Sequence, residues 1–331
     1  MTSLPPLPAR PPVSVVLPVR DEAAHLRDAV RAVLSTGYRG EVEVVIAVGP
    51  SGDGTERVAA ALADDPRVTV VDNPSGRTPD ALNVAIAAAR HDVIVRMDGH
   101  AMMPRGYIEL AVDALRTTGA GNVGGRMVPE GTTPFQKAVA VAMSSVWGLG
   151  GAGHRQGGVA GRADSVYLGS FRREALDDVG GYDSHFVRAQ DWELNLRLRH
   201  AGYTVWFVPQ MQVPYFPRAS WRDLARQFFK TGQWRREVVR LHPDTGSPRY
   251  LAAPVMTVAV AAGLVLGLLG IVAGAAWLSW LLILPLGYLA GVLGASALLA
   301  SRAGSDATLR MPLVLITMHL AWGAGFLRGV R

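Results

Sequence analysis

The stretch from Val93 to Pro104, VIVRMDGHAMMP, decides the fold, because it joins a strand to a turn that carries reactive side chains. Its apolar start is typical of a strand that is buried on both faces. Asp98 and His100 follow with one residue between them, which places them on the same face of an extended segment. A carboxylate and an imidazole at the end of a strand suggest a small metal site. The simpler interpretation is a strand that ends in an Asp-Gly turn.

Similar strand-and-helix units precede this stretch. An apolar run covers residues 13–19, residues 42–48 and 68–71 are predicted as two further strands, and each of the three is followed by a segment with a helical pattern. Strands that alternate with helices predict a parallel, doubly wound sheet. We therefore expect an α/β fold in which a mostly parallel sheet is flanked by helices.

The loops after these strands hold the candidate binding residues, because ligands of such sheets bind at the carboxyl ends of the strands. The arginines among them have the planar geometry that suits phosphate oxygens, although each charge could equally be a solvated loop residue. The polar side chains of the loops are Arg20, Glu22, Asp53, Arg77, Asp98 and His100.

The composition excludes several classes of function. The chain has 331 residues and no cysteine, which excludes disulfides, thiolate metal sites and cysteine nucleophiles. Its formal net charge is +6, and a basic chain can bind nucleic acid, anionic lipid or a phosphorylated substrate. The basic residues cluster beside the apolar C-terminal segments, and we therefore exclude nucleic acid as a partner.

The C-terminal part of the chain has the composition of a membrane protein. Residues 251–272 and 277–299 can each span a bilayer, whereas 309–327 is a weaker candidate because it contains Pro312 and His319. Residues 219–250 mix aromatic and basic side chains, as in helices that lie on anionic lipid; the alternative is an ordinary packed helix with a basic outer face. By the positive-inside rule the soluble domain is cytoplasmic, and a third span would leave Arg328 and Arg331 outside.

These patterns predict four regions. They are a disordered proline-rich lead (1–12), a soluble α/β domain (13–218), an amphipathic interfacial segment (219–250) and a membrane domain with two to three transmembrane helices (251–331). Within the soluble domain, a long glycine-rich loop holds His154 and Arg155; such loops are often functional lids, and the alternative is plain disorder. Asp191 begins a predicted helix, where it is either an N-cap or a catalytic carboxylate that faces Asp98.

Four motifs carry a resemblance to a known family: VSVVLPVRDE, RTPDALNVAI…DVIVRMDGHA, SVYLGSFRREAL and RAQDWELNLRLRHAGY. From Val13 to about Leu241, the chain resembles the family 2 glycosyltransferases of the GT-A fold. Within that family it is most similar to the bacterial membrane-associated glucosyltransferases of the succinoglycan type. The resemblance implies that residues 13–218 are a GT-A catalytic domain.

The resemblance also implies a role for each matching residue. Asp191 is the implied catalytic base, and Asp98 with His100, in place of the family's Asp-x-Asp motif, is the implied site for Mn²⁺ or Mg²⁺. The residues implied at the donor nucleotide are Pro18, Arg20, Glu22, Asp53, Arg77 and Asp98. Those assigned to the acceptor or to a lid are His154, Arg155, Gln190, Trp192, Gln233 and Trp234.

Two motifs depart from the family pattern. The loop VGPSGDGT has Val48 and Gly49 where the family has acids that read the nucleotide base, so UDP is expected from the subgroup alone. The pair Gln233-Trp234 matches the Gln-x-x-Arg-Trp motif of processive relatives only in part, so we do not expect a processive polymerase.

The implied function is an inverting transfer of a sugar from a nucleotide-sugar donor, a UDP-sugar being favoured, to a hydroxyl group of a lipid-linked glycan. The reaction would take place at the cytoplasmic face of the bacterial plasma membrane, with membrane lipids as further partners. The alternatives are a synthase that glycosylates polyprenyl phosphate and a non-catalytic nucleotide-sugar-binding membrane subunit. The sequence predicts neither the sugar, nor the linkage, nor the oligomeric state.

Overall fold

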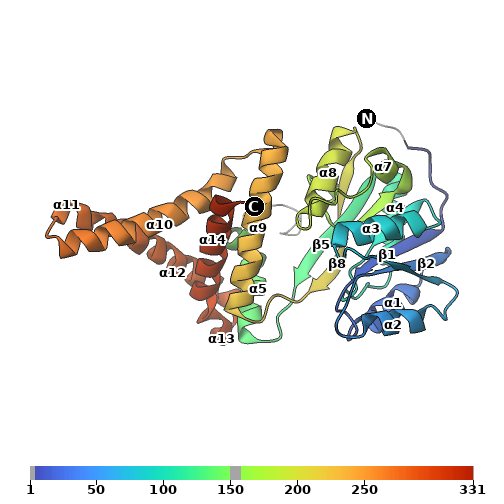
Figure 1. The fold of residues 1–331 in the computed structure, drawn as a ribbon, viewed down its shortest axis with the longest axis horizontal. Coiled ribbons are helices and arrows are strands. Elements are labelled where there is room, and N and C mark those ends of the chain that lie inside the picture. The colour runs from blue at the N-terminus through green and yellow to red at the C-terminus, as the bar shows by residue number, and fades with distance from the viewer. Residues whose placement is uncertain (1–3, 150–157, 331) are drawn as a thin grey trace. The chain divides into compact units, whose positions relative to one another are not determined.

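The computed structural model describes residues 4–149 and 158–330, and its chain divides into two compact units (Figure 1). The first unit comprises Met1–Val128 and Gly153–Tyr215, and the second comprises Pro129–Ala152 and Phe216–Arg331. The end of the first unit at Tyr215 lies close to the boundary expected near residue 218. The segment 129–152 differs from the expectation, because it groups with the C-terminal helices and not with the α/β domain.

The first unit is built on a mixed sheet, which confirms the predicted α/β class. Its strand order is β3-β2-β1-β4-β7-β5-β8-β6. Strands β1 to β4 pair in parallel, as the alternation of strands and helices predicts, whereas β7 runs antiparallel to β4 and β5. The strands are β1 (Val13–Val19), β2 (Val42–Val48), β3 (Val68–Asp72), β4 (Val93–Arg96), β5 (Asn122–Pro129), β6 (Gly161–Arg162), β7 (Tyr167–Arg172) and β8 (Val205–Tyr215).

Helices cover both faces of this sheet, and the strand side chains alternate between them. Val15 and Leu17 of β1 pack with α1, α2 and α4, while Val16 packs with α3, α7 and α8 on the other face. This double burial explains why the strands β1 and β2 are apolar at nearly every position, with Ser14 and Glu43 as the polar exceptions. The helices are α1 (Leu26–Leu34), α2 (Thr55–Leu62), α3 (Thr78–Ala88), α4 (Tyr107–Thr118), α7 (Arg173–Asp178) and α8 (Gln190–His200).

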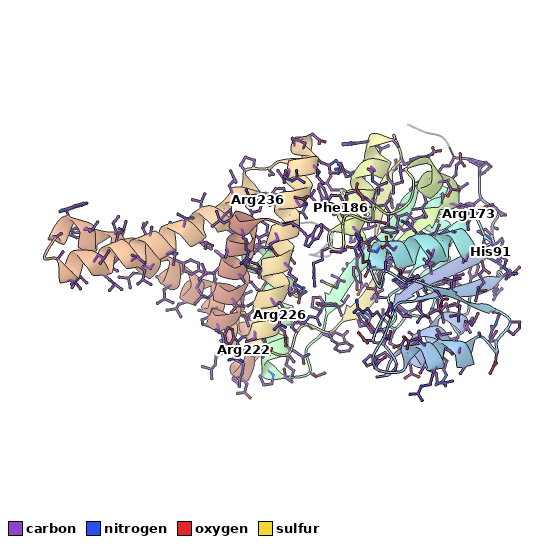
Figure 2. All side chains as sticks on the ribbon, in the orientation of Figure 1. His91, Arg173, Phe186, Arg222, Arg226 and Arg236 are labelled. Atoms are coloured by element: carbon purple, nitrogen blue, oxygen red, sulfur yellow. The ribbon has the colours of Figure 1, made fainter. Side chains whose placement is uncertain are left out.

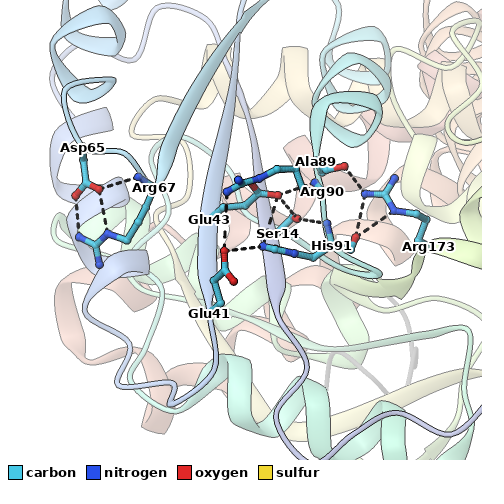
Figure 3. Close-up of polar contacts among 9 residues, drawn as sticks. All are labelled: Ser14, Glu41, Glu43, Asp65, Arg67, Ala89, Arg90, His91 and Arg173. Atoms are coloured by element: carbon cyan, nitrogen blue, oxygen red, sulfur yellow. Dashed lines mark hydrogen bonds and ion pairs between the residues drawn. The ribbon is translucent and has the colours of Figure 1, made fainter.

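A buried polar cluster ties the amino ends of the parallel strands together (Figure 3). The Ser14 hydroxyl donates to Glu43 Oε1 at 2.5 Å, and Arg90 Nε donates to Glu43 Oε2 at 2.7 Å. Burial raises the pKa of Glu43, but the hydrogen bonds from Ser14 and Arg90 outweigh it and hold the pKa below its ordinary value. Arg173 donates to the carbonyl groups of Ala89 and His91 and so joins α7 to the end of α3. The cluster stabilises the edge of the sheet opposite the carboxyl ends of the strands.

The proline-rich lead packs against the first unit where the structure describes it. Leu4 and Leu7 contact the two apolar cores, and the Pro5 carbonyl accepts a hydrogen bond from Arg172 at 2.9 Å. The Pro11 carbonyl accepts another from the Tyr38 hydroxyl at 2.7 Å. Residues 4–12 form no helix or strand, and these contacts hold them against the first unit.

The second unit is helical. Three of its segments are long and apolar enough to cross a membrane: Arg249–Val272, Ala276–Ala303 and Ser305–Arg328. Helices α10 and α12 form a hairpin with α11 at its tip, and α14 lies beside α9 (Figure 1). The helices are α5 (Pro134–Met143), α6 (Val146–Leu149), α9 (Trp221–Leu241), α10 (Arg249–Val272), α11 (Ala276–Ser279), α12 (Ile283–Ala303), α13 (Ser305–Thr308) and α14 (Met311–Arg328).

Candidate active site

Arg96 joins the two acids that the sequence singles out. It is the last residue of β4, and its side chain is only 5% exposed. Its Nη2 donates to Asp98 Oδ1 at 3.1 Å, and its Nη1 donates to Asp191 Oδ1. Asp191 lies in the first turn of α8, so the guanidinium bridges the end of a central strand and the start of a distant helix. The structure therefore brings Asp98 and Asp191 to one site, through a residue that the sequence analysis did not include.

Burial and charge set the proton affinity of this trio. Burial is the largest cause that raises the pKa of Asp191 above its ordinary value; Arg96 lowers it, and Asp98 raises it further. Burial lowers the pKa of Arg96, but the two carboxylates outweigh it, so the guanidinium stays charged. The Asp191 side chain is still 34% exposed, so one edge of the carboxylate is accessible to a substrate.

A clamp from α3 fixes the loop that precedes Asp191. The side chain of Asn83 donates to the Tyr182 carbonyl at 2.7 Å and accepts from the Tyr182 N–H at 2.8 Å. Asp80 accepts a hydrogen bond from the Ser184 hydroxyl. The ring of Tyr182 lies 6.0 Å from the guanidinium carbon of Arg96. The clamp thus positions the Tyr182 ring beside the guanidinium of Arg96, whose nitrogen atoms bind the two acids.

Arg77 takes part in the same clamp. Its guanidinium donates to the Ser184 carbonyl, and its Nε lies 3.8 Å from Asp80 Oδ2. The predicted role of Arg77 was to border the donor nucleotide. Its observed contacts hold the loop before α8, while its side chain remains 43% exposed.

Hydrogen bonds join the loops after β1 and β2. Asp53 accepts hydrogen bonds from the Ala23 N–H at 2.9 Å and from the Thr55 hydroxyl at 2.6 Å. The hydrogen bond from Thr55 is the main cause that lowers the pKa of Asp53. Asp21 adopts a left-handed backbone conformation with φ 55° and accepts from the Gly52 N–H at 2.8 Å. Asp53 therefore serves the shape of the loops, and Asp21 is a further acid of this region that the sequence analysis passed over.

The remaining donor-side residues lie at the same edge of the sheet. Pro18 is the second-last residue of β1 and pairs with Ala47 of β2. Arg20 follows the strand and donates to the Gly76 carbonyl at 3.4 Å, so it links the loops after β1 and β3. The Glu22 N–H donates to the Thr55 hydroxyl at 2.8 Å. The structure therefore gathers Pro18, Arg20 and Glu22 near Asp98, as expected for loops at the carboxyl ends of parallel strands.

His100 pairs with Glu22. Its Nδ1 lies 2.7 Å from Glu22 Oε1, and Gly99 lets the turn approach β1 so closely that a Cβ there would clash with Val19. Over residues 4–149 and 158–330, no group of three His, Cys, Asp or Glu side chains could hold a metal ion. Asp98 and His100 supply a carboxylate and an imidazole, a pair that fits Mn²⁺ if phosphate oxygens and water complete its coordination.

The residues assigned to the acceptor or lid fall in different places. His154 and Arg155 lie outside the described residues. Gln190 and Trp192 flank Asp191 in the first turn of α8. Gln233 and Trp234 belong to α9 in the second unit, where the Gln233 amide donates to the Gly329 carbonyl at 2.7 Å. Gln233 therefore holds the end of α14 in this structure.

Comparisons with known proteins identify the family of this chain. The family described as Glycosyl transferase family 2 matches residues 14–180. The succinoglycan biosynthesis protein ExoA of Rhizobium meliloti is 34% identical over 318 residues, which are 95% of this chain and 93% of ExoA. The glycosyltransferase AglE of Haloferax volcanii is 24% identical over 233 residues, 69% of this chain and 74% of AglE.

A solved structure shares the fold. It is the mannosyltransferase PcManGT from Pyrobaculum calidifontis in complex with GDP-Man and Mn²⁺, with a TM-score of 0.57 and 22% sequence identity. The likeness covers 93% of this chain and 86% of that protein, so it includes helices of both units. At this identity the likeness supports the GT-A fold and nothing finer.

Proposed function

Because this chain belongs to glycosyl transferase family 2, we propose that it is an inverting glycosyltransferase that moves a sugar from a nucleotide-sugar donor to a hydroxyl group of a lipid-linked glycan. The observation that carries the proposal is the trio of Asp98, Arg96 and Asp191 at the carboxyl edge of the parallel strands. A polysaccharide product is supported by the likeness to ExoA, a succinoglycan biosynthesis protein.

In this mechanism Asp191 is the general base. Arg96 holds Oδ1 of Asp191, and the proton of the acceptor hydroxyl is taken at Oδ2. The acceptor oxygen then forms a bond to the anomeric carbon while the bond from that carbon to the diphosphate breaks, so the nucleoside diphosphate leaves and the configuration inverts. A positioned base of this kind contributes roughly 10²–10⁴-fold in rate. The raised pKa of Asp191 suits it for the role, because it strengthens the carboxylate as a proton acceptor.

The donor is placed by the loops after β1, β2 and β4. We propose that Asp98 and His100 hold Mn²⁺ or Mg²⁺, which when bound supplies positive charge for the leaving diphosphate. Arg20 is 59% exposed and is available to phosphate oxygens from the neighbouring loop. A UDP-sugar is the donor that the subgroup favours; since PcManGT holds GDP-Man, the guanine nucleotide is the first competitor to test.

The enzyme is proposed to act at the cytoplasmic face of the bacterial plasma membrane. Three apolar helices of the second unit have the length to cross a bilayer. The arginines of α9 and of the link after α12 support a cytoplasmic position for the chain on that side of the helices. This placement gives the catalytic unit access to a lipid-linked acceptor.

The proposal is tested with the full chain in lipid nanodiscs. A panel of UDP-sugars and GDP-sugars with Mn²⁺ should identify a donor that is consumed only when a lipid-linked glycan is present. Asp191→Asn should reduce transfer roughly 10²–10⁴-fold while the donor still binds. The matched control is Asp113→Asn, an exposed acid on α4, which should keep full activity. Full transfer by Asp191→Asn would instead favour a phosphate acceptor, which needs no strong base, and so a polyprenyl-phosphate synthase.

A further inference from the structure

The long helices of the second unit differ in what covers their apolar side chains. Helices α10 and α12 expose theirs along most of their length, as expected for helices in contact with lipid. Helix α14 buries several of its apolar side chains against protein, although Leu313 and Leu327 are exposed. The exposed residues of α10 and α12 include Leu264, Val265, Leu268, Leu269, Leu286, Leu293 and Leu298, whereas the buried residues of α14 include Met311, Val314, Leu315 and Met318.

Helix α14 runs beside α9 in the same direction (Figure 1). A Cβ at Gly232 would clash with the Trp322 carbonyl, and one at Gly325 would clash with the Phe229 carbonyl, so the two backbones touch. Further along both helices, Arg236 donates to the Phe326 carbonyl in the last turn of α14, and Gln233 donates to the carbonyl of Gly329, the C-cap of that helix. These donors satisfy backbone groups that have no partner within the helix itself. The two helices therefore form one closely packed pair.

Helix α9 cannot lie within hydrocarbon. Exposed cations recur along its whole length, and Figure 2 shows three of them, Arg222, Arg226 and Arg236, spaced along the helix. Lys230 and Arg240 add two more exposed cations. Each such charge at the centre of a membrane span costs roughly 2.5–3.5 kcal/mol on insertion scales. Since α14 packs closely against α9, with Gly325 beside the Phe229 carbonyl and Trp322 beside Gly232, it lies at the same depth, in the headgroup layer.

The contact between α14 and α10 agrees with this depth. Gly323, in the C-terminal part of α14, packs against Ala253 and Thr257 in the first turns of α10. If α14 crossed the membrane from the base of the hairpin, its C-terminal part would lie near the tip of the hairpin, close to Val272. Instead, the C-terminal part of α14 returns to the base of the hairpin, where α10 begins.

We infer that the chain crosses the membrane twice, through α10 and α12, and that α14 lies with α9 in the headgroup layer on the side of the catalytic unit. The inference rests on the membrane placement in the proposed function and extends it to the third apolar helix. It puts Arg302, Arg310 and Arg328 on one side together with the arginines of α9. The positive-inside rule is then obeyed, whereas a third span would place Arg328 on the outer side.

The absence of cysteine from the chain allows a direct test. Single variants Ala276→Cys at the hairpin tip, Ser305→Cys in α13 and Arg328→Cys at the end of α14 are exposed to a membrane-impermeant maleimide. In intact spheroplasts only Ala276→Cys should be labelled, and the other two should react only after permeabilisation. Each variant should keep its sugar transfer activity, which shows that it is folded.

Two results would overturn the inference in different ways. Labelling of Arg328→Cys in intact spheroplasts would show that α14 crosses the membrane. Protection of Ala276→Cys in intact spheroplasts, with labelling after permeabilisation, would show that the hairpin does not cross, and the membrane placement itself would fail. Neither result depends on which sugar the enzyme transfers, so a failed donor assignment remains distinguishable.

Discussion

Arg96, the last residue of β4, pairs with Asp191 in the first turn of α8, 95 residues further along the chain. The same guanidinium donates to Asp98 at 3.1 Å. A planar group with several donors can hold two carboxylates at fixed angles, which a lysine ammonium on its flexible stem cannot do. The pair therefore fixes where the proposed base stands relative to the donor site.

Substitution Arg96→Lys should keep the charge and lose the bridge. We expect kcat to fall by roughly 10–100-fold because Asp191 is no longer held, while KM for the donor changes little. Steady-state rates in nanodiscs check this, with the unfolding temperature as the control for folding. In Arg96→Ala, added guanidinium should restore part of the activity. Equal losses of activity and of folded protein in both variants, with no rescue, would mean that Arg96 is only structural.

His100 stands where the family has an acid, and its role can be separated from that of Asp98 by metal preference. If His100 binds the ion, His100→Asp should shift donor binding from Mn²⁺ toward Mg²⁺, because the site would then offer only oxygen ligands. The new carboxylate would face Glu22, which lies 2.7 Å from His100 Nδ1 in the native protein. The double variant with Glu22→Gln should therefore bind the donor better than His100→Asp alone.

Calorimetric titration of the donor in Mn²⁺ and in Mg²⁺ measures this shift, and chelation of the ion should abolish tight donor binding by the native enzyme. His25→Asp, in the loop before α1, is the control for a histidine outside the site. If the ratio of the donor affinities in Mn²⁺ and Mg²⁺ is the same in His100→Asp as in the native enzyme, His100 is not a metal ligand and serves only as the partner of Glu22.

Local patterns were sufficient to predict the parallel half of the fold. The run Val13–Val19 is apolar at almost every position because both faces of β1 are covered, and β2 and β4 follow the same rule. The antiparallel half depends on pairing between strands that are distant in the sequence, such as β4 with β7. The alternation of apolar and polar residues within one strand does not specify its partner. In the same way α5 has an apolar pattern that predicts a helix, but its partners α12 and α14 come from the far end of the chain.

The candidate site shows the same division. Asp98 and Asp191 are visible in the sequence because each follows a recognisable strand or helix signal. In the sequence Arg96 is recognisable only as the last residue of the strand VIVR, because the chain brings it together with Asp98 and Asp191 only on folding. The Asn83 clamp on Tyr182 was missed for the same reason, as it joins α3 to a loop 99 residues away.

Glu43 provides a test of the scaffold that is independent of activity. The pKa of Glu43 is lower in the folded protein than in the unfolded chain. Its contribution to the free energy of unfolding is therefore fully present above the unfolded pKa of 4.5, and it is lost as the pH falls through the lower folded pKa. Glu43→Gln should therefore lower the free energy of unfolding by about 1–2 kcal/mol at pH 7, and the difference from the native protein should shrink below pH 4.5. Thermal unfolding of the detergent-solubilised protein at both pH values measures it.

The control for Glu43 is its neighbour Glu41, which contacts the same His91 but has a side chain that is 63% exposed. Glu41→Gln should leave the unfolding temperature almost unchanged at either pH, since an exposed ion pair is screened by water and salt. If Glu43→Gln were equally silent at pH 7, the hydrogen bonds from Ser14 and Arg90 would not outweigh the burial of the carboxylate. The polar cluster would then fix the geometry of the amino ends of the strands without stabilising the fold.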